Sequence, residues 1–168
     1  LDIVERRRRK ILVAPENRLG HAAIPELTLW ENVILTARES QNILENNGYL
    51  ISRNEAKRFA QTVIDEFDVR TPSVHTRASS LSGGNLQKFL IGRELLGHPR
   101  VFVVSNPTWG VDTKAQLFIH KTLIQLAEEG GSVIVLSQDI DELLAISDHI
   151  CALCHGRLSR THLTTEMT

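Results

Sequence analysis

The sequence is poor in cysteine, methionine and aromatic residues, and its composition is that of an ordinary globular protein. Its 168 residues include two cysteines, one methionine and 5% aromatic residues. The 19 basic and 20 acidic residues leave a net charge of −1, which calls for neither nucleic acid nor an anionic membrane as a partner. No apolar run approaches the roughly 20 residues that span a bilayer. With 42% hydrophobic residues, the composition predicts one soluble globular domain.

Two further absences concern the start of the chain and the binding of phosphate. The only methionine is Met167, so Leu1 is no translation start, and we expect a fragment, a processed product or an excised piece. The charged start, Leu1 to Lys10, is unlike a signal peptide. None of the five lysines follows a glycine, so the Gly-Lys-Ser/Thr loop that cradles nucleotide phosphates is absent. The chain therefore lacks the usual means of holding a triphosphate by itself.

The two cysteines form a C-x-x-C pair that is followed at once by His155, as in c-type haem attachment. Residues three apart in a strand point to opposite faces, so we favour a short apolar strand over His149–Cys154 with two buried thiols. Buried thiols fit a reducing compartment. A haem or zinc site is the alternative, and its further ligands would be His149, His155 and His162.

Apolar runs and caps predict an α/β domain. Buried strands are expected at Ile11–Ala14, Val101–Val104 and Ser132–Leu136. Their continuous apolar character is typical of a parallel sheet covered on both faces. A helix from about Asp112 to Glu129, closed by Gly130 and Gly131, completes a βαβ unit. Capping-box spacings at Thr28–Glu31 and Ser52–Glu55 predict two earlier helices, the first through about Arg38.

A phosphate-binding pattern stands at the start of another helix. Leu81-Ser82-Gly83-Gly84-Asn85 places a hydroxyl and consecutive small-residue amides where free N–H groups and the helix dipole favour an anion. Glycine there allows close approach. The helix continues through apolar residues to Gly97 and Pro99, and the buried strand Val101–Val104 follows.

In this order and spacing the chain resembles the ATP-binding subunit of ABC transporters over nearly its whole length. Leu81 to Lys88 resembles the family's signature motif, and Val101 to Pro107 resembles the Walker B strand with its loop. The other matches are the D-loop at Trp109, Gly110, Val111 and Asp112, the switch-histidine position at Gln138 and the Q-loop position at Glu16. Asn85 to Lys88 and Asn106 to Asp112 are most similar to the second ATP-binding half of bacterial importers for simple sugars and, more closely, nucleosides.

The resemblance implies a partial P-loop NTPase domain of the α/β class over residues 1–168, lacking the P-loop strand. A helical subdomain at about 21–97 would be inserted after the Q-loop strand, and 1–20 with 98–168 would form the α/β core. The missing strand would lie inside the parallel sheet, so we expect an open strand edge or gap near Val133 to Leu136. Self-association of the chain could cover that edge.

Departures from the family pattern set the expected mechanism. The Walker B aspartate and glutamate positions hold Ser105 and Asn106, Gln138 replaces the histidine, and Glu16 stands where an amide is usual. An amide cannot accept the proton of an attacking water. The chain's own site therefore lacks the carboxylates and the histidine on which the family's catalysis depends. No metal site is expected. Ser82, Gly83, Gly84 and Asn85 would instead contact the ATP phosphate bound by the partner domain.

The resemblance thus implies ATP and Mg²⁺ in the full assembly and neither bound to this chain alone. Its partners would be another ATP-binding domain and transmembrane permease subunits at the inner face of the cell membrane. A different class of function is a non-enzymatic regulatory or scaffolding module that keeps the fold for protein contacts. If the motif match were accidental, Ser105 to Pro107 would be a strand-terminating turn and Gln138 a surface residue.

Overall fold

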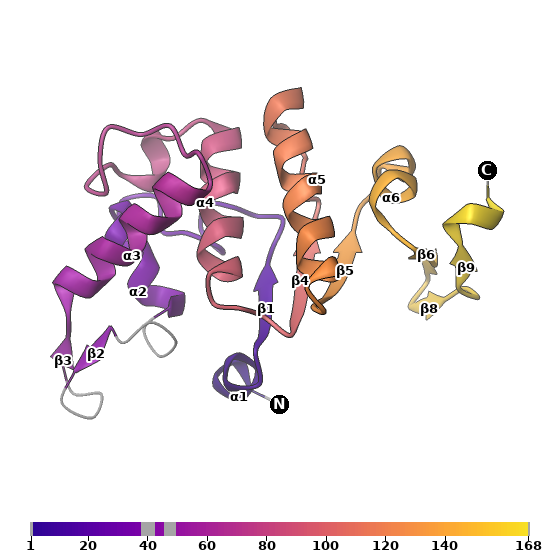
Figure 1. Ribbon diagram of the computed structural model, residues 1–168, viewed down its shortest axis with the longest axis horizontal. Helices are drawn as coiled ribbons and strands as arrows, with labels where there is room; N and C mark the ends of the chain where they lie inside the picture. Colours follow the sequence, from indigo (N-terminus) through magenta and orange to yellow (C-terminus); the bar gives the residue numbers. More distant parts are fainter. Residues whose placement is uncertain (1, 38–42, 46–49, 168) are drawn as a thin grey trace.

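The computed structural model describes residues 2–37, 43–45 and 50–167, and Figure 1 traces their course. The helices are α1 (Ile3–Arg8), α2 (Leu29–Ala37), α3 (Arg53–Glu66), α4 (Gly83–Leu95), α5 (Thr113–Glu128) and α6 (Ile140–Ile146). The longer strands are β1 (Ile11–Ala14), β4 (Val101–Ser105) and β5 (Ser132–Leu136). Two-residue strands are β2 (Leu44–Glu45), β3 (Leu50–Ile51), β6 (His149–Ile150), β7 (Leu153–Cys154), β8 (Arg157–Leu158) and β9 (His162–Leu163).

The three longer strands form one parallel sheet in the order β1-β4-β5, which confirms the three predicted strands and the βαβ unit. Leu12 lies beside Phe102, and Phe102 lies beside Val133. Neighbouring residues in a parallel register point to the same face, so these side chains share one face of the sheet. Helices α4 and α5 pack against that face and bury Phe102 completely.

The opposite face of the sheet is open in the described part of the chain, so the expectation that both faces are covered is wrong. Ile134 is 51% exposed, Leu136 44% and Val13 41%. Along β5, exposed residues alternate with half-buried ones. A sheet with apolar side chains on both faces is stabilised when other elements pack on both faces. Within the described residues, helices pack on one face only. Apolar side chains of this open face are therefore exposed to solvent.

The sheet also ends at β5. Within the described residues β5 pairs with β4 alone, which confirms the predicted strand edge near Val133 to Leu136. A groove of about 510 Å³ follows this edge, and it is lined by α5, β5, α6 and residues 147–151. The open face and the edge groove therefore lie on the same outermost strand.

The C-terminal segment does not form the predicted strand over His149–Cys154. Residues 149–150 pair with β9, whereas 153–154 form a tight hairpin with β8. His155 and Gly156 turn this hairpin with positive φ angles of 47° and 73°. Figure 1 shows the segment, in yellow, at the end of the molecule beyond β5. Both cysteines are exposed there, so the expectation of buried thiols is wrong.

The two capping boxes differ in outcome. At α2, Glu31 Oε2 accepts hydrogen bonds from the Thr28 backbone N–H at 2.8 Å and from its hydroxyl at 2.6 Å, which confirms the first box. These bonds lower the pKa of Glu31. At α3, Ser52 makes no side-chain capping bond, although the helix begins where expected. Arg38, the expected end of the first helix, lies outside the described residues.

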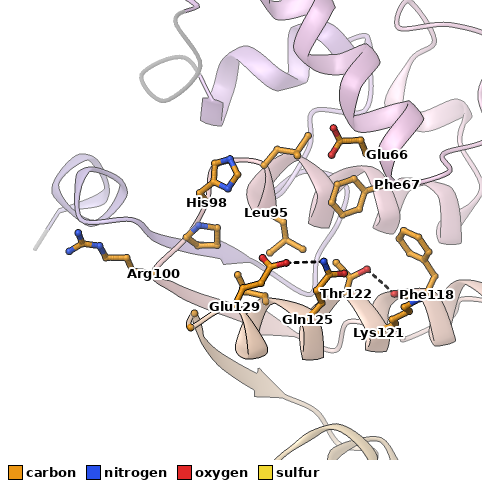
Figure 2. A pocket seen from close by; sticks show the side chains of 15 residues that line it. Glu66, Phe67, Leu95, His98, Arg100, Phe118, Lys121, Thr122, Gln125 and Glu129 are labelled. Carbon is orange, nitrogen blue, oxygen red and sulfur yellow. Dashed lines mark hydrogen bonds between the residues drawn. The ribbon is translucent and has the colours of Figure 1, made fainter.

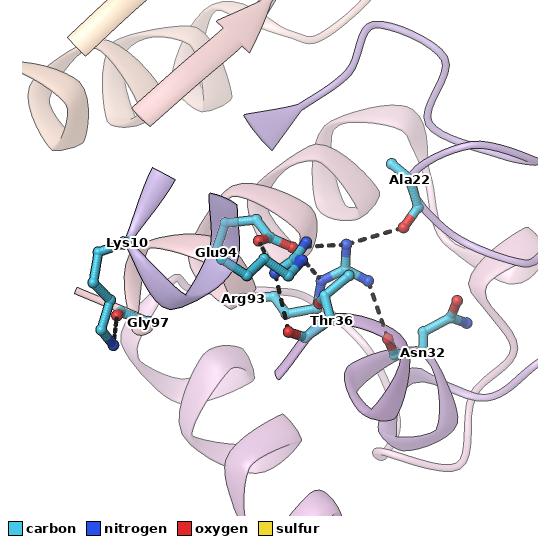
Figure 3. A network of polar contacts seen from close by, with 8 residues as sticks. Lys10, Ala22, Asn32, Thr36, Arg93, Glu94 and Gly97 are labelled. Carbon is cyan, nitrogen blue, oxygen red and sulfur yellow. Dashed lines mark hydrogen bonds and ion pairs between the residues drawn. The ribbon is translucent and has the colours of Figure 1, made fainter. Parts of the chain in front are cut away.

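A buried ionic network joins α4 to the segments before it in the chain (Figure 3). The Arg93 guanidinium, 3% exposed, donates to Asn32 O at 3.1 Å, to Ala22 O at 3.0 Å and to Glu94 Oε1 at 3.1 Å. Arg7 of α1 donates to the other Glu94 oxygen at 3.1 Å. The basic run therefore forms the end of a helix, as expected, but one of its members is tied into the interior.

The open face of β5 predicts self-association of the chain at high concentration, because exposed apolar area favours contact between copies. Sedimentation velocity should show a weight-average sedimentation coefficient that rises with concentration. Ile134→Lys should suppress that rise, since a charge on this face opposes its burial. Leu117→Lys, at another exposed apolar residue (65%), is the matched control and should change little. A chain that stays monomeric throughout would contradict the prediction.

Candidate functional site

The predicted site residues of the core lie at or just after the carboxyl ends of the three parallel strands. Because β1, β4 and β5 are parallel, the segments after Ala14, Ser105 and Leu136 leave the sheet at the same side. Ser105 pairs with Leu136, and the Asn106 N–H donates to Leu136 O at 2.7 Å. Glu16 and Gln138 are exposed and form no hydrogen bond with either residue in the described part of the chain.

The end of β4 carries no carboxylate. Ser105 and Asn106 are half-buried, and Asn106 has a φ of 46°, in the left-handed region that asparagine tolerates better than most residues. This corner turns the chain sharply into Pro107 and Thr108. A hydroxyl and an amide thus occupy the corner.

The pattern at Leu81–Asn85 begins a helix as predicted. Ser82 is the N-cap of α4, and its Oγ accepts from the Asn85 backbone N–H at 3.4 Å and from Asn85 Nδ2 at 2.9 Å. The Asn85 Oδ1 in turn accepts from the Arg70 N–H at 2.8 Å. The side chain of Asn85 is therefore engaged within the chain, and it holds Ser82 in place.

The two glycines bring this helix start against the loop at residues 109–112. A Cβ on Gly83 would lie 3.0 Å from Arg18 Nη1 and 3.3 Å from Gly110 O. A Cβ on Gly84 would lie 3.4 Å from both Asp112 Oδ2 and Ala115 Cβ. The first contact is tighter than a side chain tolerates easily. The structure thus joins two motifs that lie 25 residues or more apart in sequence.

Arg18 links the same two segments, and the sequence did not single it out. Its guanidinium donates to Gly83 O at 3.4 Å and to Trp109 O. Partial burial lowers the pKa of Arg18, because removing the guanidinium from water disfavours its charge. An arginine two residues after Glu16, in a loop, gives no local signal of such a role. Its partners lie 65 and 91 residues away in the chain.

The loop at 109–112 is exposed at its tip and anchored at its end. The Trp109 side chain is 66% exposed. Asp112 is the N-cap of α5, and its Oδ1 accepts from the Ala115 N–H at 2.9 Å. This hydrogen bond is the main reason why the pKa of Asp112 is lowered. A large apolar side chain is therefore held in solvent beside Ser82 and Gly83, which are also exposed.

A second group missed by the sequence analysis lies behind this loop. Glu142 of α6 is buried, and its carboxylate accepts from Thr108, Ser137 and His120. Glu142, Thr108 and Ser137 line a pocket of about 220 Å³, whose walls also include Asn106 and Trp109. From the sequence alone, Glu142 cannot be distinguished from an ordinary acidic residue in the first turn of a helix.

A larger pocket of about 630 Å³ lies elsewhere, between the end of α4 and α5 (Figure 2). Phe67, Leu95 and Phe118 line its interior, and the charged side chains of Glu66, Lys121 and Glu129 lie around it. It contains none of the site residues expected from the sequence. The candidate site is therefore an exposed surface with a small polar pocket behind it, and the larger pocket is separate from it.

Metal ligands do not converge in the described part of the chain. No group of three or more His, Cys, Asp and Glu side chains is placed to hold an ion there. The histidines around Cys151 and Cys154 are distributed over short strands and a turn. For the same residues, no helix combines the length and apolar character needed to cross a bilayer.

Known proteins are similar to this chain over most of its length. The nucleoside import ATP-binding protein NupA of Lactococcus lactis is 38% identical over 162 residues, which are 94% of this chain and 32% of NupA. The xylose import ATP-binding protein XylG of Moorella thermoacetica is 31% identical over 94% of this chain and 30% of its own length. The chain is a homologue of the ATP-binding proteins of nucleoside and sugar importers. No protein-family model matches it.

Solved structures agree on the fold. The ATP-binding cassette MJ0796, in a dimeric post-hydrolysis state with ADP and Pi, superposes with a TM-score of 0.73 at 24% identity, covering 98% of this chain and 68% of that one. The chain thus has the α/β fold of an ABC transporter cassette. It spans about a third of the length of the curated relatives it matches.

The capping role of Ser82 predicts a measurable effect on stability. Ser82→Ala removes the acceptor of two hydrogen bonds at the start of α4, so the free energy of unfolding should fall by about 0.5–2 kcal/mol. Ser80→Ala, two residues earlier at an exposed position, should have little effect. Urea denaturation followed by circular dichroism measures both variants. Equal losses would contradict the capping role.

Proposed function

We propose that the chain is part of the ATP-binding, energy-coupling subunit of an importer for nucleosides or simple sugars. One observation carries the proposal: an exposed, well-capped signature helix start lies against the D-loop, while the end of β4 has no carboxylate. The first feature suits contact with a nucleotide phosphate held by another domain. The second leaves the chain's own site without a base.

The residues at the chain's own site do not fit Mg²⁺ or hydrolysis. Mg²⁺ prefers carboxylate oxygens, and Ser105 and Asn106 supply a hydroxyl and an amide. Gln138 cannot titrate near neutral pH. The nearest buried carboxylate, Glu142, is already occupied by three hydrogen-bond donors. We therefore derive no catalytic step at this end of the sheet.

The signature residues are proposed to act in trans. Ser82 and the backbone N–H groups of Gly83 and Gly84 would face ATP held by a second ATP-binding domain. Asn85 would support them from within the chain, because its own N–H and side chain are bonded to Ser82. Free N–H groups at a helix start and the helix dipole both favour phosphate oxygens. The exposed Trp109 of the adjoining D-loop would contact that same domain, since large aromatic side chains anchor interfaces. The pair of sites would be asymmetric, with one competent and one degenerate.

A P-loop strand from another part of the subunit would complete the sheet. The unpaired edge of β5, the groove of about 510 Å³ beside it and the open apolar face all suit an added strand with its helix. On this proposal residues 1–20 and 98–168 are the α/β core, and 21–97 form the helical subdomain. The chain would then be a partial cassette rather than an independent ATPase.

The helical subdomain is proposed to dock to a transmembrane permease subunit at the cytoplasmic face of the membrane. Leu35 of α2 is 46% exposed and would be available there. Trp30 is half-buried, with an edge contact to His75 at 6.5 Å and Lys57 Nζ 5.4 Å from its ring centre. Trp30 therefore also stabilises the packing of α2, and a variant there needs a folding control. The relatedness to NupA favours nucleosides over sugars as the solute.

The isolated chain should release no phosphate from ATP above background. It has no Gly-Lys-Ser/Thr loop and no carboxylate after β4, so nothing holds the triphosphate or activates water. The paired change Ser105→Asp with Asn106→Glu should not create activity, because a base is useless without bound ATP. A malachite-green assay measures both proteins, with Asn106→Ala as the control. Phosphate release that scales with the chain and disappears on Asn106→Ala would refute the prediction.

The trans role of the signature predicts opposite sensitivities in the assembled transporter. Ser82→Arg should reduce ATP turnover at least a hundredfold, since one hydrogen bond to developing charge is worth about 2.7–4 kcal/mol. Asn106→Ala should change turnover little, because it lines a site without carboxylates. Ser82→Ala separates the capping effect from the block.

The turnover of Ser82→Arg and of Asn106→Ala decides between the proposed roles. Equal and severe losses for Ser82→Arg and Asn106→Ala would sink the asymmetric-site proposal. A folded and assembled Ser82→Arg transporter with full turnover would favour a regulatory or scaffolding role for this chain.

A further inference from the structure

Glu142 is a buried carboxylate at which three separate segments meet. Its side chain is 2% exposed. Oε1 accepts from the Thr108 hydroxyl at 2.6 Å and lies 3.1 Å from His120 Nε2, while Oε2 accepts from the Ser137 hydroxyl at 2.6 Å. Thr108 belongs to the loop after β4, Ser137 to the loop after β5, and His120 to α5.

The energetics make these contacts strong constraints on the two loops. A carboxylate taken out of water loses several kcal/mol unless donors replace its hydration. Hydroxyl donors at 2.6 Å are in the short range that is typical of charge-assisted bonds. Moving either loop away would leave part of the buried charge without a donor. The carboxylate therefore favours one arrangement of both loops together.

The loop after β4 needs such a constraint. Asn106 is in the left-handed region, with φ of 46°, which costs energy for a residue other than glycine. The turn bonds that close the loop are long: Trp109 N–H to Asn106 O is 3.2 Å, and Val111 N–H to Thr108 O is 3.3 Å. Thr108 lies between these two bonds. Its hydroxyl anchors the loop to the interior immediately before the exposed Trp109.

We propose that Glu142 is a positioning residue that fixes the Trp109 loop against the segment carrying Gln138, so that the two loops keep one geometry. The carboxylate touches no substrate and acts through Thr108 and Ser137. The consequence for catalysis rests on the proposed function: the Trp109 loop would be presented to the second ATP-binding domain in a fixed form. The loop geometry itself is a property of this chain alone.

Site-resolved amide hydrogen exchange of the chain tests the proposal. Glu142→Gln replaces one acceptor oxygen with a donor that faces hydroxyl donors, and it should accelerate exchange at Trp109 and Val111 about tenfold or more. Amides of β4 and the middle of α4 should keep their protection. Thr108→Val removes only the hydroxyl and should give the same acceleration, and the double variant should add nothing further.

The controls separate positioning from general stability. Glu128→Gln, at an exposed residue of α5, should leave the exchange at Trp109 and Val111 unchanged. Uniform acceleration over the whole domain, or no change at these two amides in Thr108→Val, would overturn the proposal. If Glu142→Gln does not fold, Thr108→Val decides alone.

Turnover of the assembled transporter is a separate measurement. Thr108→Val should lower it several-fold if the Trp109 loop serves the second domain. Unchanged turnover together with accelerated loop exchange would count against the proposed function and leave the positioning role established.

Discussion

One buried guanidinium fixes the frame on which the rest of the structure depends. Arg93 donates to the backbone oxygens of Ala22 and Asn32 and to the Glu94 carboxylate. Burial lowers the pKa of Arg93, and Glu94 opposes that shift by stabilising the charge. A buried charge deprived of its partners costs about 3–5 kcal/mol. The loop after β1 and the start of α2 are therefore held against α4.

The opposite end of α4 shows what that frame positions. The helix begins at Gly83 and Gly84, whose missing side chains let it lie against Gly110 and Asp112. Arg18, from the same loop that Arg93 anchors further along, reaches over this junction to backbone oxygens on both sides. The helix start and the loop thus form one surface. Its geometry arises from close packing and from hydrogen bonds that the Arg18 side chain donates to backbone oxygens.

Local features of the sequence predicted local features of the structure. Apolar runs located the three strands, the capping box at Thr28 located the start of α2, and the helix starts expected near Ser82 and Asp112 are those of α4 and α5. Burial was less predictable: an apolar strand shows that cover is needed, but not which residues supply it. This is why the open face of β5 was unexpected. The contacts of Arg18 and Glu142 were missed for a related reason, because each spans 22 or more residues to at least one partner and leaves no periodic pattern.

Folding alone accounts for much of the signature region. Ser82 is needed as a cap, Gly83 for its close contact with Gly110 and Asp112 as a second cap. Folding does not require the tip of the loop to be a tryptophan that is 66% exposed, beside a helix start at which Ser82 and Gly83 are exposed. Exposed aromatic surface is unfavourable unless a partner covers it, and free N–H groups favour an anion. Both features point outward on one surface. A second domain that brings a bound phosphate would satisfy them together.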